Sequence, residues 1–176
     1  MDGYVQLDEI SMDILKEIGN VGTGNAVTSL SRMMEQPIEL DLPSLKVVKY
    51  YKMHELLEQP EELQTGILIE VTGQLKGIFL FMLSEAFTKT VINTILGEEE
   101  RNLTSLDDME CSLISELGNI MCGSYIRALS QLMDMDMDVS VPELCIDMGG
   151  AILTYPMSRW VIVSDDILLI ENIFHM

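Results

Sequence analysis

Cysteine and histidine are scarce in this sequence of 176 residues. The three thiols, Cys111, Cys122 and Cys145, cannot form a complete disulfide framework within the chain, and their spacing fits no zinc pattern. Reduced cysteines are therefore the simplest interpretation. His54 and His175 lie far apart in sequence and are more typical of surface residues than of metal ligands. The sequence predicts no bound metal.

Positively charged residues are also few, and long apolar runs are missing. Ten Lys and Arg residues face 29 Asp and Glu residues, which gives a formal net charge of -19. Nucleic-acid phosphates and anionic membrane surfaces repel such a chain, so neither is an expected partner. No apolar run reaches the roughly 18 residues that span a bilayer, and residues 1–15 lack the layout of a signal peptide. We expect a cytoplasmic protein that binds another protein.

What the sequence does contain is an internal repeat. Residues 13–43 align without a gap to residues 112–142, which lie 99 positions further on. The identical pairs are Glu17/Glu116, Gly19/Gly118, Asn20/Asn119, Gly24/Gly123, Leu30/Leu129, Ser31/Ser130, Met34/Met133 and Pro43/Pro142. Two copies are too few for a solenoid. They predict one domain, 1–176, with two related halves at about 10–100 and 105–176, the second apparently incomplete at its C-terminus.

The periodicity predicts which elements fill these halves. Each copy opens with a helix and then alternates apolar and polar residues, as in Ile38, Leu40 and Leu42, which is typical of a strand with one buried face. In the second copy this alternation covers Met133–Val141, and a calcium loop is disfavoured because the required glycine and distal glutamate are missing. Strands are expected at 65–72, 75–82, 144–153, 160–164 and 167–174, and a helix from Ser84 to about Leu96.

The two repeat helices carry an apolar stripe and an opposite polar stripe. The apolar stripes contain Ile14, Leu15, Ile18 and Val21 in the first copy and Leu113, Ile114, Leu117 and Ile120 in the second. The polar stripes contain Asp13, Glu17, Asn20 and Gly24 in the first copy and Ser112, Glu116, Asn119 and Gly123 in the second.

A single carboxylate and amide one turn apart are common on solvated helices. Here the pair occurs twice in register, and each asparagine is followed 23 residues later by a proline, Pro43 or Pro142. Gly24 and Gly123 also lie in helices, where glycine costs up to about 1 kcal/mol relative to alanine. A small residue on a polar stripe lets another backbone come close. The repetition therefore indicates a functional site.

This pattern resembles the motif of the CheC-like chemotaxis phosphatases, which include CheC, CheX and FliY. Their motif is Asp or Ser, three residues, Glu, two residues, Asn, twenty-two residues and Pro, and both copies match it at every position. The resemblance covers nearly the whole chain. It implies an α/β fold of the α+β type, in which the halves share an antiparallel sheet and expose two long motif helices on one side.

The resemblance also implies a function, a hydrolase in two-component signalling that removes the aspartyl phosphate from a CheY-type response regulator. Asn20 and Asn119 would orient the attacking water, and Glu17 and Glu116 would pair with a lysine of the regulator. Asp13 and Ser112 would be accessory, and Pro43 and Pro142 structural. The regulator, not this chain, would hold Mg2+. A non-catalytic module that binds CheD or a response regulator, and a flagellar switch component, are the alternatives.

Overall fold

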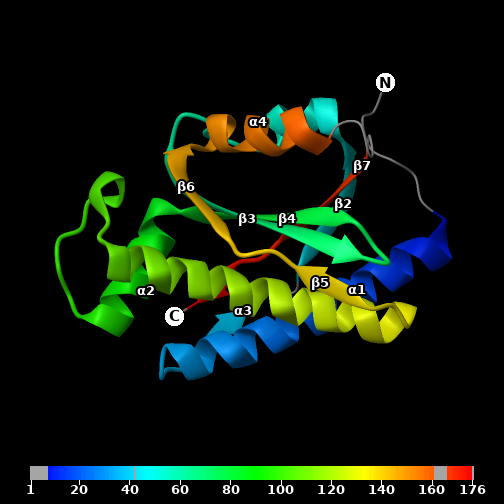
Figure 1. Cartoon of the computed structure of the whole chain (residues 1–176), viewed down its shortest axis with the longest axis horizontal. Helices are drawn as coiled ribbons and strands as arrows, with labels where there is room; N and C mark the ends of the chain where they lie inside the picture. Colours follow the sequence, from blue (N-terminus) through cyan, green and yellow to red (C-terminus); the bar gives the residue numbers. More distant parts are fainter. Residues whose placement is uncertain (1–7, 42, 161–165, 176) are drawn as a thin grey trace.

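The computed structural model describes residues 8–41, 43–160 and 166–175, which form helices packed against antiparallel strands (Figure 1). The helices are α1 (Glu9–Met33), α2 (Glu85–Leu96), α3 (Asp108–Met133) and α4 (Gly149–Trp160), with short 3-10 turns η1 (Tyr50–Glu55) and η2 (Leu103–Ser105). The strands are β1 (Glu39–Leu40), β2 (Ser44–Lys49), β3 (Leu63–Gly73), β4 (Gly77–Ser84), β5 (Met137–Val139), β6 (Glu143–Met148), β7 (Asp166–Glu171) and β8 (Phe174–His175).

The strands of the two halves pair with each other. The long strand β3 pairs with β4 of its own half on one side and with β5 and β6 of the other half on the other side. In the same way β7 pairs with β2, and β8 pairs with β1. All of these pairings are antiparallel. The expected fold class is confirmed, with sheet strands shared between two related halves.

The repeat is visible in the order of the elements. α1 begins at Glu9 and α3 at Asp108, and β2 begins at Ser44 and β6 at Glu143, so both pairs of counterparts lie 99 positions apart. β3 and β7 are counterparts as well, because β3 pairs with β6 and β7 pairs with β2, the counterpart of β6. Because strands of each half pair with strands of the other half, we infer that the halves fold together.

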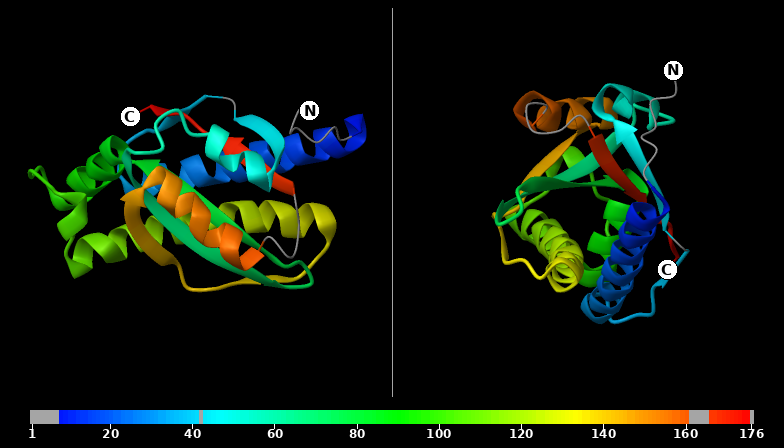
Figure 2. Two further views of the ribbon diagram at one scale, coloured as in Figure 1. Left: turned by 90° about the horizontal axis from the view of Figure 1, so that it is seen from above. Right: turned by 90° about the vertical axis from the view of Figure 1, so that its right-hand side faces the viewer.

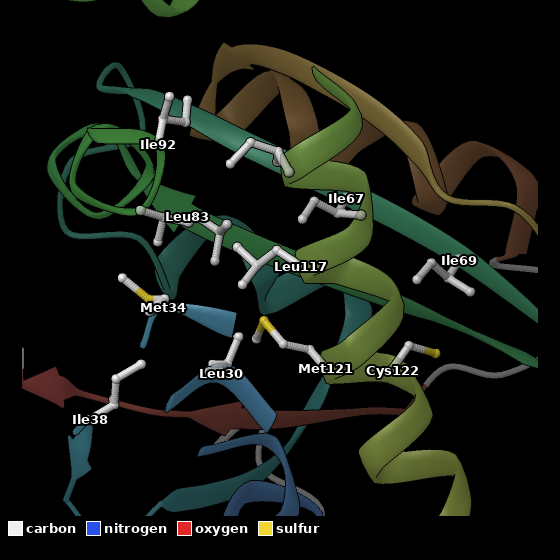
Figure 3. Close-up of a cluster of buried hydrophobic side chains, with 12 residues drawn as sticks. Leu30, Met34, Ile38, Ile67, Ile69, Leu83, Ile92, Leu117, Met121 and Cys122 are labelled. Atoms are coloured by element: carbon white, nitrogen blue, oxygen red, sulfur yellow. The ribbon is translucent and has the colours of Figure 1, made fainter. Parts of the chain in front are cut away.

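The main hydrophobic core lies between the two long helices, β3 and α2 (Figure 3). Leu30, Ile67, Ile92, Ile114 and Leu117 are fully buried there. Of the apolar stripes, Ile18, Ile114 and Leu117 are buried, Leu15, Val21, Leu113 and Ile120 are half-buried, and Ile14 is 50% exposed. Ile14 was expected inside. Its counterpart Leu113 packs against the core, which α2 completes. No equivalent of α2 covers α1 within the described residues, so Ile14 stays exposed.

The strand expected over Met133–Val141 is wrong for most of its length. α3 continues to Met133 and ends at Asp134, which adopts a left-handed conformation with φ of 51°. Only Met137–Val139 form a strand, β5, and Val139 and Val141 are exposed. The alternation does not build a buried face because β5 pairs only with the end of β3. In the first copy Leu42 lies outside the described residues, and β1 is confined to Glu39–Leu40.

The strand expected over 144–153 gives way to a helix after Met148. Gly149 and Gly150 donate their backbone N–H groups to the carbonyl oxygens of Glu62 and Pro60, which starts α4. Ile152 and Leu153 are then buried on α4. The hairpin of β3 and β4 and the helix between Ser84 and Gly97 are confirmed. Strand 167–174 is confirmed as β7 and β8, whereas 160–164 falls almost wholly outside the described residues.

No helix among the described residues combines the length and the apolar composition that a membrane crossing requires.

The three thiols differ in accessibility, which yields a first prediction. Cys122 is buried in the core, and this burial raises the pKa of its thiol from 9.0 to about 12, whereas Cys145 is exposed. Because only the thiolate reacts, we expect a thiol reagent at pH 8 to label Cys145 in the native state and Cys122 only after unfolding. Peptide mapping of the labelled protein measures this. Equal labelling rates at both thiols in the native state would contradict the burial of Cys122.

Candidate functional site

The two motif helices lie side by side on one side of the sheet and run in opposite directions (Figures 1 and 2). Their starts are capped alike. The Asp8 carboxylate accepts the Ser11 N–H at 2.7 Å, and the Asp107 carboxylate accepts the Glu110 N–H at 2.8 Å. These bonds satisfy backbone donors that the first turn of a helix leaves free. Hydrogen bonding by the Ser11 side chain, and then by its backbone N–H, lowers the pKa of Asp8.

A polar contact fixes α1 against α3 where they meet. The hydroxyl groups of Thr23 and Tyr125 are hydrogen-bonded at 2.6 Å, and Thr23 also donates to the Asn172 side-chain oxygen at 3.0 Å. The Tyr125 ring lies against Gly22, where an added Cβ would overlap it. Glycine therefore permits the close approach of the two helices, and this contact holds both polar stripes in place.

The polar stripe of α1 faces solvent as expected. Asp13, Glu17, Asn20 and Gly24 are all exposed. The Asp13 carboxylate lies 3.7 Å from the Lys16 ammonium group, an exposed pair one turn apart. Within the described residues, no hydrogen bond or ion pair engages the side chains of Glu17 and Asn20. Both side chains are therefore available to a partner.

The polar stripe of α3 contains hydrogen bonds between its own residues. Ser112, Glu116 and Asn119 are exposed, and Gly123 is half-buried. The Asn119 side-chain amide donates to the Glu116 carboxylate at 3.4 Å, a long hydrogen bond that brings the two groups together. The Ser112 hydroxyl donates to the Asp108 carbonyl oxygen at 2.7 Å. The same face thus presents a carboxylate and an amide side by side.

The prolines of the motif lie away from these stripes. Pro43 directly precedes β2 and Pro142 directly precedes β6, and both are half-buried. Each therefore stands at the entry to the strand that crosses into the other half. This position fits a structural role, in which proline limits the backbone where the chain turns.

The glycines of α3 make a matched prediction. A Cβ at Gly118 would lie 2.5 Å from Cγ2 of the fully buried Ile67, whereas a Cβ at Gly123 would meet nothing within 4 Å. We expect Gly118→Ala to lower the free energy of unfolding by about 1–3 kcal/mol. Gly123→Ala should raise it by about 0.5–1 kcal/mol because alanine favours the helix. Urea unfolding measures both, and a loss of stability in both variants would contradict this packing.

One residue on the α3 stripe was not predicted. Arg127 lies one turn beyond Gly123 and is exposed, and its Nε donates to the Gly123 carbonyl oxygen at 3.1 Å. Its counterpart in α1 is Thr28, whose hydroxyl donates to the Gly24 carbonyl oxygen at 3.0 Å. The sequence signal was available, because Arg127 continues the stripe of Glu116 and Gly123 at helical spacing. The repeat alignment does not single it out, because arginine and threonine are not a matching pair.

The arrangement is an open, exposed surface rather than an enclosing pocket. The polar groups on this surface include two amides and their neighbouring carboxylates, all on exposed helix faces. Within the described part of the chain, no group of three or more His, Cys, Asp or Glu side chains is placed to hold a metal ion. His175 instead lies 3.2 Å from the Asp41 carboxylate. Such a surface suits insertion into the site of another macromolecule.

Fold and site together define a two-repeat α/β protein with one exposed Glu–Asn pair on each repeat helix. The CheC-like family model matches residues 10–46 and 109–146, which are the two repeats. The chain belongs to this CheC-like family of chemotaxis proteins.

The chain is similar to several named proteins. It is 26% identical over 168 residues to the CheY-P phosphatase CheC of Bacillus subtilis, with 94% of this chain and 80% of that protein covered. It is 31% identical over 108 residues to the CheY-P phosphatase CheX of Thermotoga maritima, with 58% and 66% covered. The flagellar motor switch phosphatase FliY of Bacillus subtilis is 24% identical over 139 residues, which cover 78% of this chain and 36% of that protein.

Solved structures show the same fold. Thermotoga maritima FliY matches with a TM-score of 0.75 and 23% identity, covering 97% of this chain and 85% of that chain. A FliG–FliM complex of H. pylori matches with a TM-score of 0.70 and 12% identity, covering 97% and 88%.

Proposed function

We propose that this chain is a phosphatase that hydrolyses the aspartyl phosphate of a CheY-type response regulator. The observation that carries the proposal is the duplicated Glu–Asn pair, exposed on two helices that the same fold holds in equivalent positions. The names of the relatives CheC and CheX, both CheY-P phosphatases, support the same reaction.

In this proposal each asparagine positions the water that attacks phosphorus. The water oxygen forms the new bond to phosphorus, the bond from phosphorus to the aspartate oxygen breaks, and the water proton leaves with inorganic phosphate or to solvent. An amide suits the task because it donates and accepts hydrogen bonds while staying uncharged beside the phosphate. Asn20 and Asn119 both face solvent, so each can enter the regulator's site. Positioning of this kind is the main contribution that a phosphoryl transfer needs.

The remaining motif residues dock the helix. Glu17 and Glu116 each pair with a lysine beside the regulator's aspartyl phosphate, and Asp13 and Ser112 lie one turn further from the reaction. Gly24 and Gly123 leave open space on the stripe, which lets the partner's backbone approach. Mg2+ is held by the regulator, whose carboxylates supply the oxygen ligands that this ion prefers.

Turnover tests the proposal. Phosphorylated regulator is mixed with this chain at about one part in fifty, and inorganic phosphate is followed after the phosphodonor has been removed. We expect the whole regulator pool to lose its phosphate faster than without the chain, so that phosphate released exceeds the chain present many times over. Release limited to one phosphate per chain, or a longer phosphate lifetime, would indicate a binding protein instead.

A flagellar switch component is the second candidate. The name of the relative FliY, a flagellar motor switch phosphatase that is 24% identical over 139 residues, supports this alternative. A switch role predicts stable co-purification with motor proteins and an unchanged phosphate lifetime. Binding of a CheD-type deamidase is the other alternative that the family resemblance implies. A pull-down with the deamidase would detect it, and the phosphate lifetime should again be unchanged.

A further inference from the structure

We propose that Arg127 is a docking residue specific to the α3 site, which binds a carboxylate at the rim of the phosphorylated partner's active site. The proposal rests on the phosphatase function above, because that function defines the partner. It makes the two repeats unequal in how they recognise the same substrate.

The charges on the two stripes differ. On α1 the stripe carries Asp13 and Glu17, and the nearby Lys16 is already paired with Asp13. On α3 the first position is the neutral Ser112, and the stripe carries Glu116 and Arg127. Arg127 has no acidic partner among the described residues, in a chain whose formal net charge is -19.

The side chain of Arg127 is turned toward the motif. Its Nε donates to the Gly123 carbonyl oxygen, so the guanidinium group lies back along the stripe. Asn119 and Gly123 are four residues apart, which is about 6 Å along a helix. The guanidinium is therefore too far along the helix to share the phosphate that Asn119 faces, but it lies within reach of groups around that phosphate.

The partner supplies the matching chemistry. The receiver is the part of the response regulator that carries the aspartyl phosphate. Because it holds Mg2+ beside this phosphate, it needs carboxylate ligands, so acidic groups surround its site. The remaining N–H donors of Arg127 form a fork that fits a carboxylate with two parallel hydrogen bonds. Thr28, at the matching position of α1, has a neutral side chain whose hydroxyl is already bonded to Gly24. Only the α3 site gains this charge contact.

The test isolates one site at a time. In an Asn20→Ala background, where only the α3 site works, Arg127→Thr should raise KM about fivefold at low ionic strength and leave kcat unchanged. Arg127→Lys should recover part of the loss because it restores the charge without the fork. The effect should shrink at about 0.5 M salt, where exposed charges are screened. In an Asn119→Ala background, Thr28→Arg should lower KM at the remaining α1 site.

A binding arm separates this proposal from the phosphatase proposal. In a Glu17→Ala, Asn20→Ala background, which removes docking at α1, Kd is measured for the receiver carrying beryllofluoride, which imitates the phosphoryl group and is not hydrolysed. Arg127→Thr should weaken this binding about fivefold at low salt. Arg127-dependent binding without turnover would overturn the phosphatase function alone. Turnover and binding that Arg127→Thr leaves unchanged at low salt, or no binding of this receiver at all, would overturn the role of Arg127.

Discussion

Replacing Asn20 and Asn119 together by alanine is expected to lower turnover of the phosphorylated regulator by about 10²–10³-fold, the loss typical of removing one positioned polar group from a reaction. Both side chains are exposed, so their removal leaves no cavity and no buried group without a partner. The affinity for the regulator should change much less, because the glutamates still dock each helix. Steady-state phosphate release and a separate binding titration measure the two quantities.

The chain offers a matched control for this variant. Asn25 is also exposed on α1 but lies off the polar stripe, so Asn25→Ala removes the same chemical group without touching the motif. It should leave turnover unchanged. Full activity in the double variant would show that the asparagines do not position the water, and the proposed mechanism would then be wrong.

The second large effect concerns the ion pair that anchors the start of α3. Arg101 Nε donates to the Glu110 carboxylate at 2.6 Å, and the side chains of Arg101 and Glu110 are only 6% and 12% exposed. Arg101 also donates to the Gly97 carbonyl oxygen at 2.8 Å and to the Asn93 side chain. The other Glu110 oxygen accepts the Asp107 N–H at 2.9 Å. This network ties the end of α2 to the cap of α3.

Arg101→Met is therefore expected to lower the free energy of unfolding by about 3 kcal/mol, because it leaves the Glu110 carboxylate buried without its charge partner. Adding Glu110→Gln removes that unpaired charge and keeps an oxygen for the Asp107 N–H, so the double variant should recover part of the loss. Urea unfolding of the four proteins in this cycle measures the coupling. An Arg101→Met variant as stable as the original would mean that the pair is worth no more than a surface salt bridge.

Local patterns predicted the elements that carry the motif. The helix of each repeat follows from its 3.6-residue periodicity, and α2 follows from the Ser84 cap and the Gly97 stop. These signals depend on residues a few positions apart. The motif spacing was also sufficient to put Glu17 and Asn20, or Glu116 and Asn119, on one exposed face.

Two predicted elements were wrong because tertiary contacts decided them. α4 contains Gly149, Gly150 and Pro156, which all disfavour a helix, yet the bonds to Pro60 and Glu62 and the burial of Ile152 and Leu153 hold it in place. The Met-Asp alternation of the second repeat resembles a strand, but an alternating segment needs a neighbour along its whole length to become one. No local pattern reveals how far β3 extends alongside it.

The hydrogen bonds that hold α1 against α3 could not be predicted from the sequence either. Thr23 and Tyr125 are 102 positions apart, and Thr23 and Asn172 are 149 apart. Thr23 and Tyr125 meet because α1 packs against α3, and Asn172 follows the end of β7. Repeat alignment pairs Tyr125 with Ala26 and Thr23 with Cys122, so the symmetry of the sequence gives no sign of this bond.

The central claim is that each motif helix carries a working site, and the most direct measurement compares phosphate lifetimes on one regulator with four proteins. These are the unchanged chain, Asn20→Ala, Asn119→Ala and the double variant, each at a small fraction of the regulator concentration. The account predicts that each single variant keeps part of the activity, that the two parts together approach the activity of the unchanged chain, and that the double variant keeps almost none. A single variant that loses everything while the other loses nothing would contradict two working sites, and an unchanged lifetime with the folded chain would contradict the phosphatase itself.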